Sequence, residues 1–368
     1  MRILFLGDAS NYHNTLAKAV ASMGHDVTIA SHGSYWMNTG RDIDISRPCK
    51  GKLGGALLWI KLNTSLRNSF KGYDVVQISN PIFLSLRPHR IRKIFDRLKR
   101  DNGNIFLTAL ETDSYFVEMC CMPHSPLRYS EWQINDKPGP IIGQKEDWLQ
   151  PVLTDHCQYV YDNIDGAISA LYEYDLSIKR ILDVNKCAYG GLPIDTNAIT
   201  PHYIDYPPEK VSLFLGRHRN RKAEKGTDVI ERVAKAVVEK YPDRCKLDIV
   251  EDLPYKEYLT RLRNAHVVLD QLYSYTPATN ALLAMAMGLN TLSGGEKEFY
   301  EFIGEKELHP IINATPNEEA LFNTIEDVVL NPELIVKRSH EGRKFVEKHH
   351  NHKIVAQRFI DFWEKNIK

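Results

Sequence analysis

The 368-residue sequence lacks a long apolar run, because no stretch approaches the ~18 apolar residues that span a membrane. The apolar start of the chain, residues 1–8, is too short for the hydrophobic region of a secretion signal, so we expect a cytoplasmic protein. The six cysteines are scattered, and without a secretion signal we expect reduced thiols. Adjacent Cys120 and Cys121 lack the C-x-x-C spacing of a zinc or redox site, so no metal site is expected.

A net charge is also absent, since 47 Lys and Arg residues balance 47 Asp and Glu residues. No global field would draw such a chain onto nucleic acid, and we expect no nucleic-acid partner. The loop after the first predicted strand has no G-x-G-x-x-G pattern, which weakens any interpretation as a dinucleotide-binding protein.

Two successive series of short apolar strands and helices are present instead. Residues 2–31 predict a strand, a glycine-containing loop, a helix and a second strand, which is the opening of a parallel sheet. A second series begins at Val211, after the proline-containing residues 200–209. The aromatic and proline-rich residues 115–160 predict a long excursion over the first domain.

The length of the chain exceeds that of one comfortable core, which favours two domains. We predict an α/β protein with two Rossmann-like, doubly wound parallel-sheet domains facing a central cleft. The first covers residues 1–203 and the second residues 204–349, while a last helix at about 350–368 packs back on the first. Ligands of such sheets bind at the carboxyl ends of the strands.

A basic loop, residues 216–226 with the sequence GRHRNRKAEKG, follows the first strand of the second series. Arginine can hold phosphate oxygens with two hydrogen bonds, and lysine supplies a point charge. A loop of this kind at a strand end suits a ligand with two or three negative charges. The alternative is a solvated basic loop.

A buried helix is predicted further on, with Thr276 as its N-cap, Pro277 in its first turn and Gly288 at its end. Its body is small and apolar, so its N-terminus would lie inside the protein. Unpaired N–H groups and the positive end of the helix dipole suit a phosphate there. The alternative is a well-capped core helix without a ligand.

These residues resemble a known family. Gly216-Arg217, Lys225-Gly226 and the Ala-Met-Ala-x-Gly of residues 284–288 look like the C-terminal domain of GT-B glycosyltransferases, with the retaining family 4 enzymes nearest in pattern. Residues 24–28 are similar to the "GHeVt" that follows the first helix of that family. Residues 107–113 resemble its strand and loop with His-Gly-x-Asp, and residues 252–258 resemble the segment beside the nucleotide base.

The resemblance implies a glycosyltransferase that moves a hexose or related sugar from a nucleoside-diphosphate sugar to a glycan or lipid-linked acceptor, with retention, in cell-surface polysaccharide or glycoconjugate synthesis. It implies no cofactor and no metal, because Arg217 and Lys225 would offset the charge of the departing diphosphate. These two residues and Asp113 form the implied catalytic set. Donor-binding residues would be Gly216, Leu253, Thr276, Thr279, Asn280, Ala281 and Glu296. Acceptor-side residues would be Asp8, Asn11, His13 and Glu111.

The sequence departs from the family at its pair of glutamates eight residues apart, which are replaced by Tyr275 and Leu283. Asn280 would then take over the ribose contact, and Glu296 is the nearest carboxylate in a glycine-rich loop. The family's histidine before Asp113 is replaced by Leu110 or Glu111. The alternative function is therefore a weak or inactive sugar-nucleotide-binding protein that serves as a partner or scaffold.

Two basic segments lie in the predicted acceptor domain. The predicted helix from Arg87 to Arg100 carries cations on one face, and residues 50–61 mix lysines with apolar residues. We expect this face to dock on an anionic membrane surface, as a peripheral protein on the inner face of the cytoplasmic membrane. The alternative is a solvated helix face.

Overall fold

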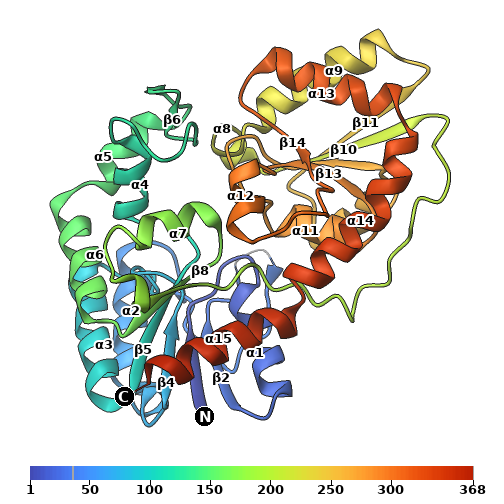
Figure 1. Ribbon diagram of the computed structural model, residues 1–368. Coiled ribbons are helices and arrows are strands. Elements are labelled where there is room, and N and C mark those ends of the chain that lie inside the picture. Colours follow the sequence, from blue (N-terminus) through green and yellow to red (C-terminus); the bar gives the residue numbers. More distant parts are fainter. Residues whose placement is uncertain (35–36, 368) are drawn as a thin grey trace. The chain divides into compact units, whose positions relative to one another are not determined.

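The computed structural model describes residues 1–34 and 37–367 (Figure 1). The chain forms two compact units. The first contains Met1–Met119, Gln144–Pro193 and the residues from His352 onward, and the second contains Cys120–Gly143 and Ile194–Asn351. The chain thus leaves the first unit at residue 193, ahead of the expected boundary at 203, and the last helix belongs to the first unit.

The first unit is built on a parallel sheet with the strand order β3-β2-β1-β4-β5-β8-β9. Its central strands β4 and β5 are buried at every residue, as expected for a parallel sheet covered by helices on both faces. The strands are β1 (Arg2–Leu6), β2 (Asp26–Ser31), β3 (Ile43–Asp44), β4 (Val75–Ile78), β5 (Asn104–Ala109), β8 (Gly166–Ser169) and β9 (Cys187–Tyr189).

The helices of the first unit follow these strands in the chain. In α3 the apolar residues Ile91, Ile94, Phe95 and Leu98 are buried, in agreement with their helical spacing. The helices are α1 (Tyr12–Ser22), α2 (Gly51–Asn63), α3 (Pro88–Asp101), α5 (Lys145–Trp148), α6 (Pro151–Asn163), α7 (Tyr172–Ile178) and α15 (His352–Asn366), and α4 (Ser114–Cys121) begins in this unit.

The last helix, α15, lies beside α1 (red and blue in Figure 1) and closes the first unit with a buried hydrogen-bond chain. Trp363 Nε1 donates to Gln77 Oε1 (2.8 Å), and Gln77 Nε2 donates to Thr108 Oγ1 (3.0 Å). His13 Nδ1 is 2.7 Å from the Gly7 carbonyl, which only accepts, so Nδ1 carries the proton. The Thr108 hydroxyl therefore donates to His13 Nε2 (2.9 Å), and every member of the chain has a partner.

The second unit has its own parallel sheet, with the order β11-β10-β12-β13-β14. Its strands are β10 (Val211–Arg217), β11 (Cys245–Glu251), β12 (Val267–Leu269), β13 (Asn290–Ser293) and β14 (Ile312–Asn313). Its helices are α8 (Lys222–Lys225), α9 (Thr227–Lys240), α10 (Tyr255–Leu262), α11 (Thr279–Ala286), α12 (Lys297–Phe302), α13 (Glu318–Leu330) and α14 (Glu333–His349).

Residues 120–143 also belong to the second unit, which corrects the expectation that they run over the first domain. They contain a short hairpin, β6 (Gln133–Ile134) and β7 (Lys137–Pro138), joined through Asn135 and Asp136. Both turn residues have positive φ (49° and 60°), as a two-residue hairpin turn requires. Residues 120–143 are called the hairpin segment below, and its Trp132 is fully buried.

Candidate functional site

The polar residues of the second unit gather at the carboxyl ends of its strands. Because the strands are all parallel, these ends lie along one edge of the sheet. Arg217 is the last residue of β10 and Glu251 the last of β11, Asp270 follows β12, and Glu296 follows β13. The edge therefore brings together four segments that are far apart in the sequence.

Arg217 is held by two carboxylates at this edge. Its Nε lies 2.9 Å from Glu251 Oε2, and its Nη1 pairs with Glu231 of α9. Glu251 also pairs with Lys222 (2.8 Å) and Arg219 (3.0 Å). Hydrogen bonds from Lys222 and Arg219, and then the Arg217 charge, hold the pKa of Glu251 at about 2. The basic loop is thus gathered around one permanently ionised carboxylate.

Asp270 joins the basic loop to helix α11. Its carboxylate is buried, with Oδ1 3.9 Å from Lys225 Nζ. Asn280 Nδ2 donates to Oδ1 (3.2 Å), and Ser293 Oγ donates to Oδ2 (3.0 Å). The predicted catalytic residue Lys225 and the predicted donor-binding residue Asn280 are therefore brought to the same carboxylate. Sequence analysis did not single out Asp270, although its place directly after an apolar strand was a usable signal.

Tyr258 of α10 makes a second connection between the loop and the helix. Its hydroxyl donates to Asn280 Oδ1 (2.6 Å), and burial raises its pKa, so the proton stays on the phenol. A Cβ on Gly216 would lie only 2.5 Å from the Tyr258 ring, so the close approach of this ring explains glycine at that position. Leu253 and Tyr258 pack against the same apolar cluster.

The start of α11 differs from the prediction. The helix begins at Thr279 with Ala278 as its N-cap, and no side chain of the described residues caps it. Thr276 is fully buried in the preceding turn, where its N–H donates to Ser274 Oγ (3.2 Å). The N–H groups of the first turn, at Thr279 and Ala281, are the ones that a helix leaves unpaired within itself. They suit an anion as the sequence analysis proposed for this end.

Glu296 lies at the same edge, beyond β13, and hairpin-segment residues bind it. Tyr129 donates its hydroxyl proton to Glu296 Oε1 (2.5 Å), and Arg128 Nη2 pairs with Oε2 (2.6 Å). Asn313 Nδ2 also donates to Oε1 (2.9 Å). The carboxylate that sequence analysis assigned to the donor is thus shared with residues 128 and 129, which no sequence signal connected to it.

Tyr275, where the resembling family has a glutamate, anchors the same hairpin segment. Its ring packs against Tyr129 with the centroids 4.9 Å apart, and its hydroxyl accepts from the Arg128 N–H (2.6 Å). The Arg128 guanidinium lies 5.2 Å from the Tyr275 ring centroid. The departure from the family pattern therefore coincides with an aromatic contact that the family glutamate would not make.

In the first unit, Asp8 and His13 lie close together after β1. Asp8 accepts from the His13 N–H (2.8 Å) and from Ser34 Oγ (2.9 Å), while burial raises its pKa to about 6. Burial also lowers the pKa of His13 to about 4, so the imidazole is neutral near pH 7. Asn11 opens α1 in the left-handed conformation (φ 64°) and donates from Nδ2 to Thr15 Oγ1 (3.1 Å).

Asp113 and Glu111 follow β5 and have different surroundings. Asp113 is buried and accepts from the Phe116 N–H (2.9 Å) and from the Tyr161 hydroxyl (2.7 Å), while burial raises its pKa. It thus fixes the start of α4 rather than facing solvent. Glu111 is exposed and accepts from Asn80 Nδ2 (2.9 Å).

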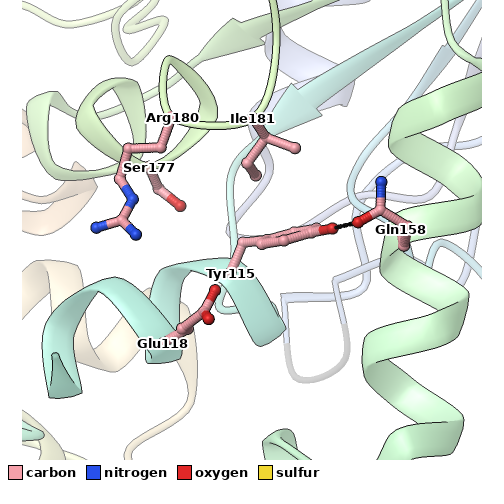
Figure 2. Close-up of a pocket in the computed structure, with 6 residues that line it drawn as sticks. All are labelled: Tyr115, Glu118, Gln158, Ser177, Arg180 and Ile181. Carbon is pink, nitrogen blue, oxygen red and sulfur yellow. Dashed lines mark hydrogen bonds between the residues drawn. The ribbon is translucent and has the colours of Figure 1, made fainter.

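A pocket of about 300 Å³ opens in the first unit beside α4 (Figure 2). Its lining comes from α4, α6 and α7 and from the residues that follow α7. The Tyr115 ring forms one wall, and its hydroxyl bonds with Gln158. A carboxylate and a guanidinium complete the polar part of the lining. The lining residues are Tyr115, Glu118, Gln158, Ser177, Arg180 and Ile181.

Within residues 1–34 and 37–367, no group of three or more His, Cys, Asp and Glu side chains is arranged to hold a metal ion. The cysteines in this part of the chain are free thiols.

No protein-family description matches the chain, and no curated protein matches it either. Solved structures do resemble it. Sucrose-phosphate synthase from Thermosynechococcus elongatus has a TM-score of 0.64 at 12% identity, with 99% of each chain covered. Anabaena HepE, solved in complex with UDP and glucose, has a TM-score of 0.60 at 11% identity, again with 99% of each chain covered.

A UDP-N-acetylglucosamine 2-epimerase assigned as putative, from Listeria monocytogenes, has a TM-score of 0.56 at 12% identity and covers 97% of this chain and 94% of its own. These likenesses confirm the predicted fold, a GT-B chain of two Rossmann-like domains. Transferases and an epimerase share that fold, so the fold does not determine the reaction.

Proposed function

We propose that the protein is a glycosyltransferase that moves a sugar from a nucleoside-diphosphate sugar to a glycan or lipid-linked acceptor, with retention of configuration. One observation carries the proposal: at the strand ends of the second unit, a basic loop and the uncapped N-terminus of α11 are tied together through Asp270. The resembling structures include one solved with UDP and glucose, which supports a sugar nucleotide as the ligand.

The diphosphate is the part of the donor that this edge suits. Arg217 and Lys225 would contact its oxygens, and the N–H groups at Thr279 to Ala281 would face them. As the bond between sugar and phosphate breaks, negative charge grows on the departing nucleoside diphosphate. Fixed cations and N–H groups stabilise that charge without rearranging, which is the main catalytic contribution expected here.

The donor must displace carboxylates to reach these cations. Arg217 exchanges its contact with Glu231 or Glu251 for phosphate oxygens, and Lys225 moves from Asp270, which keeps its bonds from Asn280 and Ser293. Gly216, Leu253 and Thr276 are proposed to contact the donor beside these cations. In the proposal Glu296 contacts the transferred sugar through Oε2, which it shares with Arg128, because Oε1 already accepts from Tyr129 and Asn313.

A retaining reaction is compatible with the absence of the family's two glutamates from this site. A retaining reaction in which the acceptor attacks on the face that the leaving group departs from takes its base from the departing phosphate and needs little from the protein. Tyr275 and Leu283 offer no carboxylate. Asp113, proposed as part of the catalytic set, would act by holding α4 in place for the acceptor, because both its oxygens already accept hydrogen bonds.

The acceptor side is proposed to be the pocket beside α4. An aromatic wall at Tyr115 suits the apolar face of a sugar ring, and Glu118 and Gln158 offer oxygen and nitrogen atoms to its hydroxyl groups. Asp8, Asn11 and His13 support this unit from the loop after β1, and Glu111 is an exposed carboxylate after β5. Synthesis of a cell-surface polysaccharide or glycoconjugate would employ such a pair of substrates.

Binding of the nucleotide tests the central claim. A thermal-shift screen of UDP, GDP and their sugars should give a stabilising ligand, because a ligand that binds only the folded state raises its melting temperature. Arg217→Ala and Lys225→Ala should each weaken that binding by about 1.5–3 kcal/mol, since each removes a charge-assisted hydrogen bond. Lys240→Ala is the matched control, because Lys240 ends α9 and pairs with Glu326 away from the strand ends.

Turnover then separates a transferase from the other possibilities. The transferase releases nucleoside diphosphate in proportion to acceptor glycosylated, whereas an epimerase interconverts the sugar nucleotide and releases none. Binding without consumption of any donor, with any acceptor extract, would leave a sugar-nucleotide-binding protein and reject the enzyme. Unchanged affinity in both cation variants would reject the assignment of these residues.

A further inference from the structure

Helix α2 presents three large apolar side chains to solvent. Leu53, Leu57 and Ile60 have exposed fractions of 65%, 39% and 55%. They follow one another at four and three residues, so they line one face of the helix. Exposure of such an apolar row to water is unfavourable. An exposed apolar patch of this kind marks a surface that contacts another molecule.

The opposite face of α2 is fastened to the first unit. Leu58 and Leu62 are fully buried in its core. A Cβ on Gly54 would lie 1.7 Å from the Cys49 carbonyl oxygen, so glycine allows the chain to pass tightly against the helix. The helix is therefore held in one orientation, with the apolar row outward as a built feature.

Arginines of α3 secure the same helix. Arg97 donates to the Leu62 carbonyl (2.8 Å) and to Asn63 Oδ1 (3.1 Å), and Arg90 donates to the Gly55 carbonyl (3.2 Å). Arg90 also lies over the Trp59 ring at 5.5 Å. Arg90 and Arg97 belong to the basic face of α3 that the sequence predicted as a docking surface. In the structure these two residues hold α2.

The segment around α2 carries charge of one sign. Every charged side chain from Ile45 to Tyr73 is a cation: Arg47, Lys50, Lys52, Lys61, Arg67 and Lys71. On a helical projection Lys52 and Lys61 lie on opposite sides of the apolar row. Lys50 and Lys52 are exposed. The Lys61 ammonium donates to the Asp44 carbonyl (2.6 Å). An apolar row bordered by cations is the pattern of a helix that lies in the interface of an anionic bilayer.

We propose that α2 docks the first unit on an anionic phospholipid bilayer, with Leu53, Leu57 and Ile60 inserted among the acyl chains and the lysines beside the headgroups. Among the described residues no helix is long and apolar enough to cross a membrane, so contact would be in the plane of the interface. The choice of a lipid-linked acceptor rests on the proposed function, whereas the docking itself does not.

Charge distinguishes the bilayer from a second copy of this chain as the occupant. Two copies meeting through α2 would oppose cations to cations, and like charges held close together are unfavourable. Anionic headgroups complement the same surface, and each Lys or Arg near them adds attraction. An anionic bilayer thus provides acyl chains for the apolar row and negative headgroups for the cations beside it.

Vesicle sedimentation of the full chain tests the proposal. We expect binding to vesicles of phosphatidylglycerol mixed with phosphatidylcholine, little binding to phosphatidylcholine alone, and weaker binding at high salt. The variant L53Q/L57Q/I60Q should lose about tenfold or more in partition to the anionic vesicles, and K50Q/K52Q about fivefold or more, given the contribution of each apolar chain and each cation.

The matched control is V152Q/V184Q, which removes exposed apolar side chains of the same unit outside α2 (exposed fractions 54% and 65%). It should leave partition unchanged. Equal losses in the control and in the α2 variants, or no binding of the unmodified chain at low salt, would overturn the proposal. So would a dimer in light scattering that the L53Q/L57Q/I60Q variant abolishes.

The nucleotide response keeps this test separate from the proposed function. All these changes lie in the first unit, on solvent-facing positions, so each variant should keep the thermal shift that a nucleoside diphosphate gives. If vesicle binding depends on α2 while no sugar nucleotide binds, the docking surface stands and the glycosyltransferase proposal fails. If a nucleotide binds and the vesicles do not, the docking proposal fails, and the proposed function is left to the turnover experiment.

Discussion

At the scale of single residues, the cations of the candidate donor site are already paired with carboxylates. Arg217, Arg219 and Lys222 all contact Glu251, and Arg217 also pairs with Glu231. A diphosphate has to compete with those carboxylates for the same cations. Glu251 therefore sets how strongly the loop attracts an anion, although it touches no ligand itself in the proposal.

Replacing Glu251 by glutamine should tighten nucleoside-diphosphate binding. The change removes one negative charge from among three cations, so roughly fivefold tighter binding is expected, as for a single charge contact near the surface. Isothermal titration calorimetry measures it. Asp248→Asn is the control, since Asp248 lies on the same strand and pairs with Arg261. Weaker binding in Glu251→Gln would mean that Glu251 orients the loop more than it competes with the ligand.

The pair Asp8 and His13 makes a second prediction at this scale. The pKa of Asp8 rises from 3.8 to about 6 on folding, so its contribution to stability is complete below pH 3.8 and is lost as the pH rises through 6. The pKa of His13 falls from 6.5 to about 4, so its contribution is present above pH 6.5 and is lost as the pH falls through 4. Near pH 5 the unfolded chain holds the proton on His13 and the folded chain holds it on Asp8.

The contributions of Asp8 and His13 to the free energy of unfolding change with pH in opposite directions. They therefore offset each other in the unmodified protein, and the contribution of one residue becomes measurable when the other is replaced. In Asp8→Asn, the free energy of unfolding relative to the unmodified protein should rise by about 2 kcal/mol between pH 4 and pH 6. Urea unfolding of both proteins at pH 4, 5 and 6 measures the difference. A difference that does not change with pH would contradict the raised pKa of Asp8.

At the scale of elements, α15 shows how a distant helix completes a core. Its Trp363 is fully buried and donates to Gln77 Oε1 in β4. Packing brings the helix to the sheet, and the hydrogen bond fixes its register, because the acceptor is also buried. The element is thus part of the first unit although it comes last in the chain.

Trp363→Phe should lower the free energy of unfolding by about 1–3 kcal/mol, because it leaves the buried Gln77 oxygen without its donor. Trp132→Phe is the control, since Trp132 is also fully buried but its Nε1 has no hydrogen-bond partner among the described residues. Urea unfolding followed by circular dichroism compares the two. Equal losses would show that ring volume, and not the hydrogen bond, determines the effect.

Most long elements were predictable because their patterns are local. The buried residues of α3 and the strands β1 and β2 follow from spacing and apolar runs. The edge strands β3 and β14 have two residues each, which is too short for periodicity to register. The start of α11 was placed two residues early because Thr276 looked like a cap, whereas tertiary packing buries it in the preceding turn.

At the scale of the whole molecule, neither unit is one continuous segment. The chain passes from one to the other after residues 119, 143, 193 and 351. The Rossmann-like repeat was predictable from alternating strands and helices, and structural likeness confirms it. The place of residues 120–143 was not predictable, because their contacts to Glu296 and Tyr275 join positions ~150 residues apart without any periodic pattern.

A fragment covering residues 194–351 should therefore be incomplete. It lacks Trp132, Arg128 and Tyr129, which leaves Glu296 and Tyr275 without those partners. We expect a lower melting temperature for this fragment than for one that carries residues 120–143 fused to it, and partial recovery when a 120–143 peptide is added. A peptide with Tyr129→Phe and Arg128→Ala is the control. A fragment that melts at the same temperature with and without the segment would refute this dependence.

The hydrogen-bond chain from Trp363 to Gly7 has a consequence for how this protein can vary among relatives. The donors and acceptors of its members are matched to one another, so replacing one member leaves a buried neighbour without its partner. Substitutions at Gln77, Thr108, His13 and Trp363 should therefore occur together, although the two ends of the set are 350 positions apart. In an alignment of homologues, substitutions at these four positions should therefore covary. A homologue with an apolar residue at 77 would also carry a side chain without an N–H at 363.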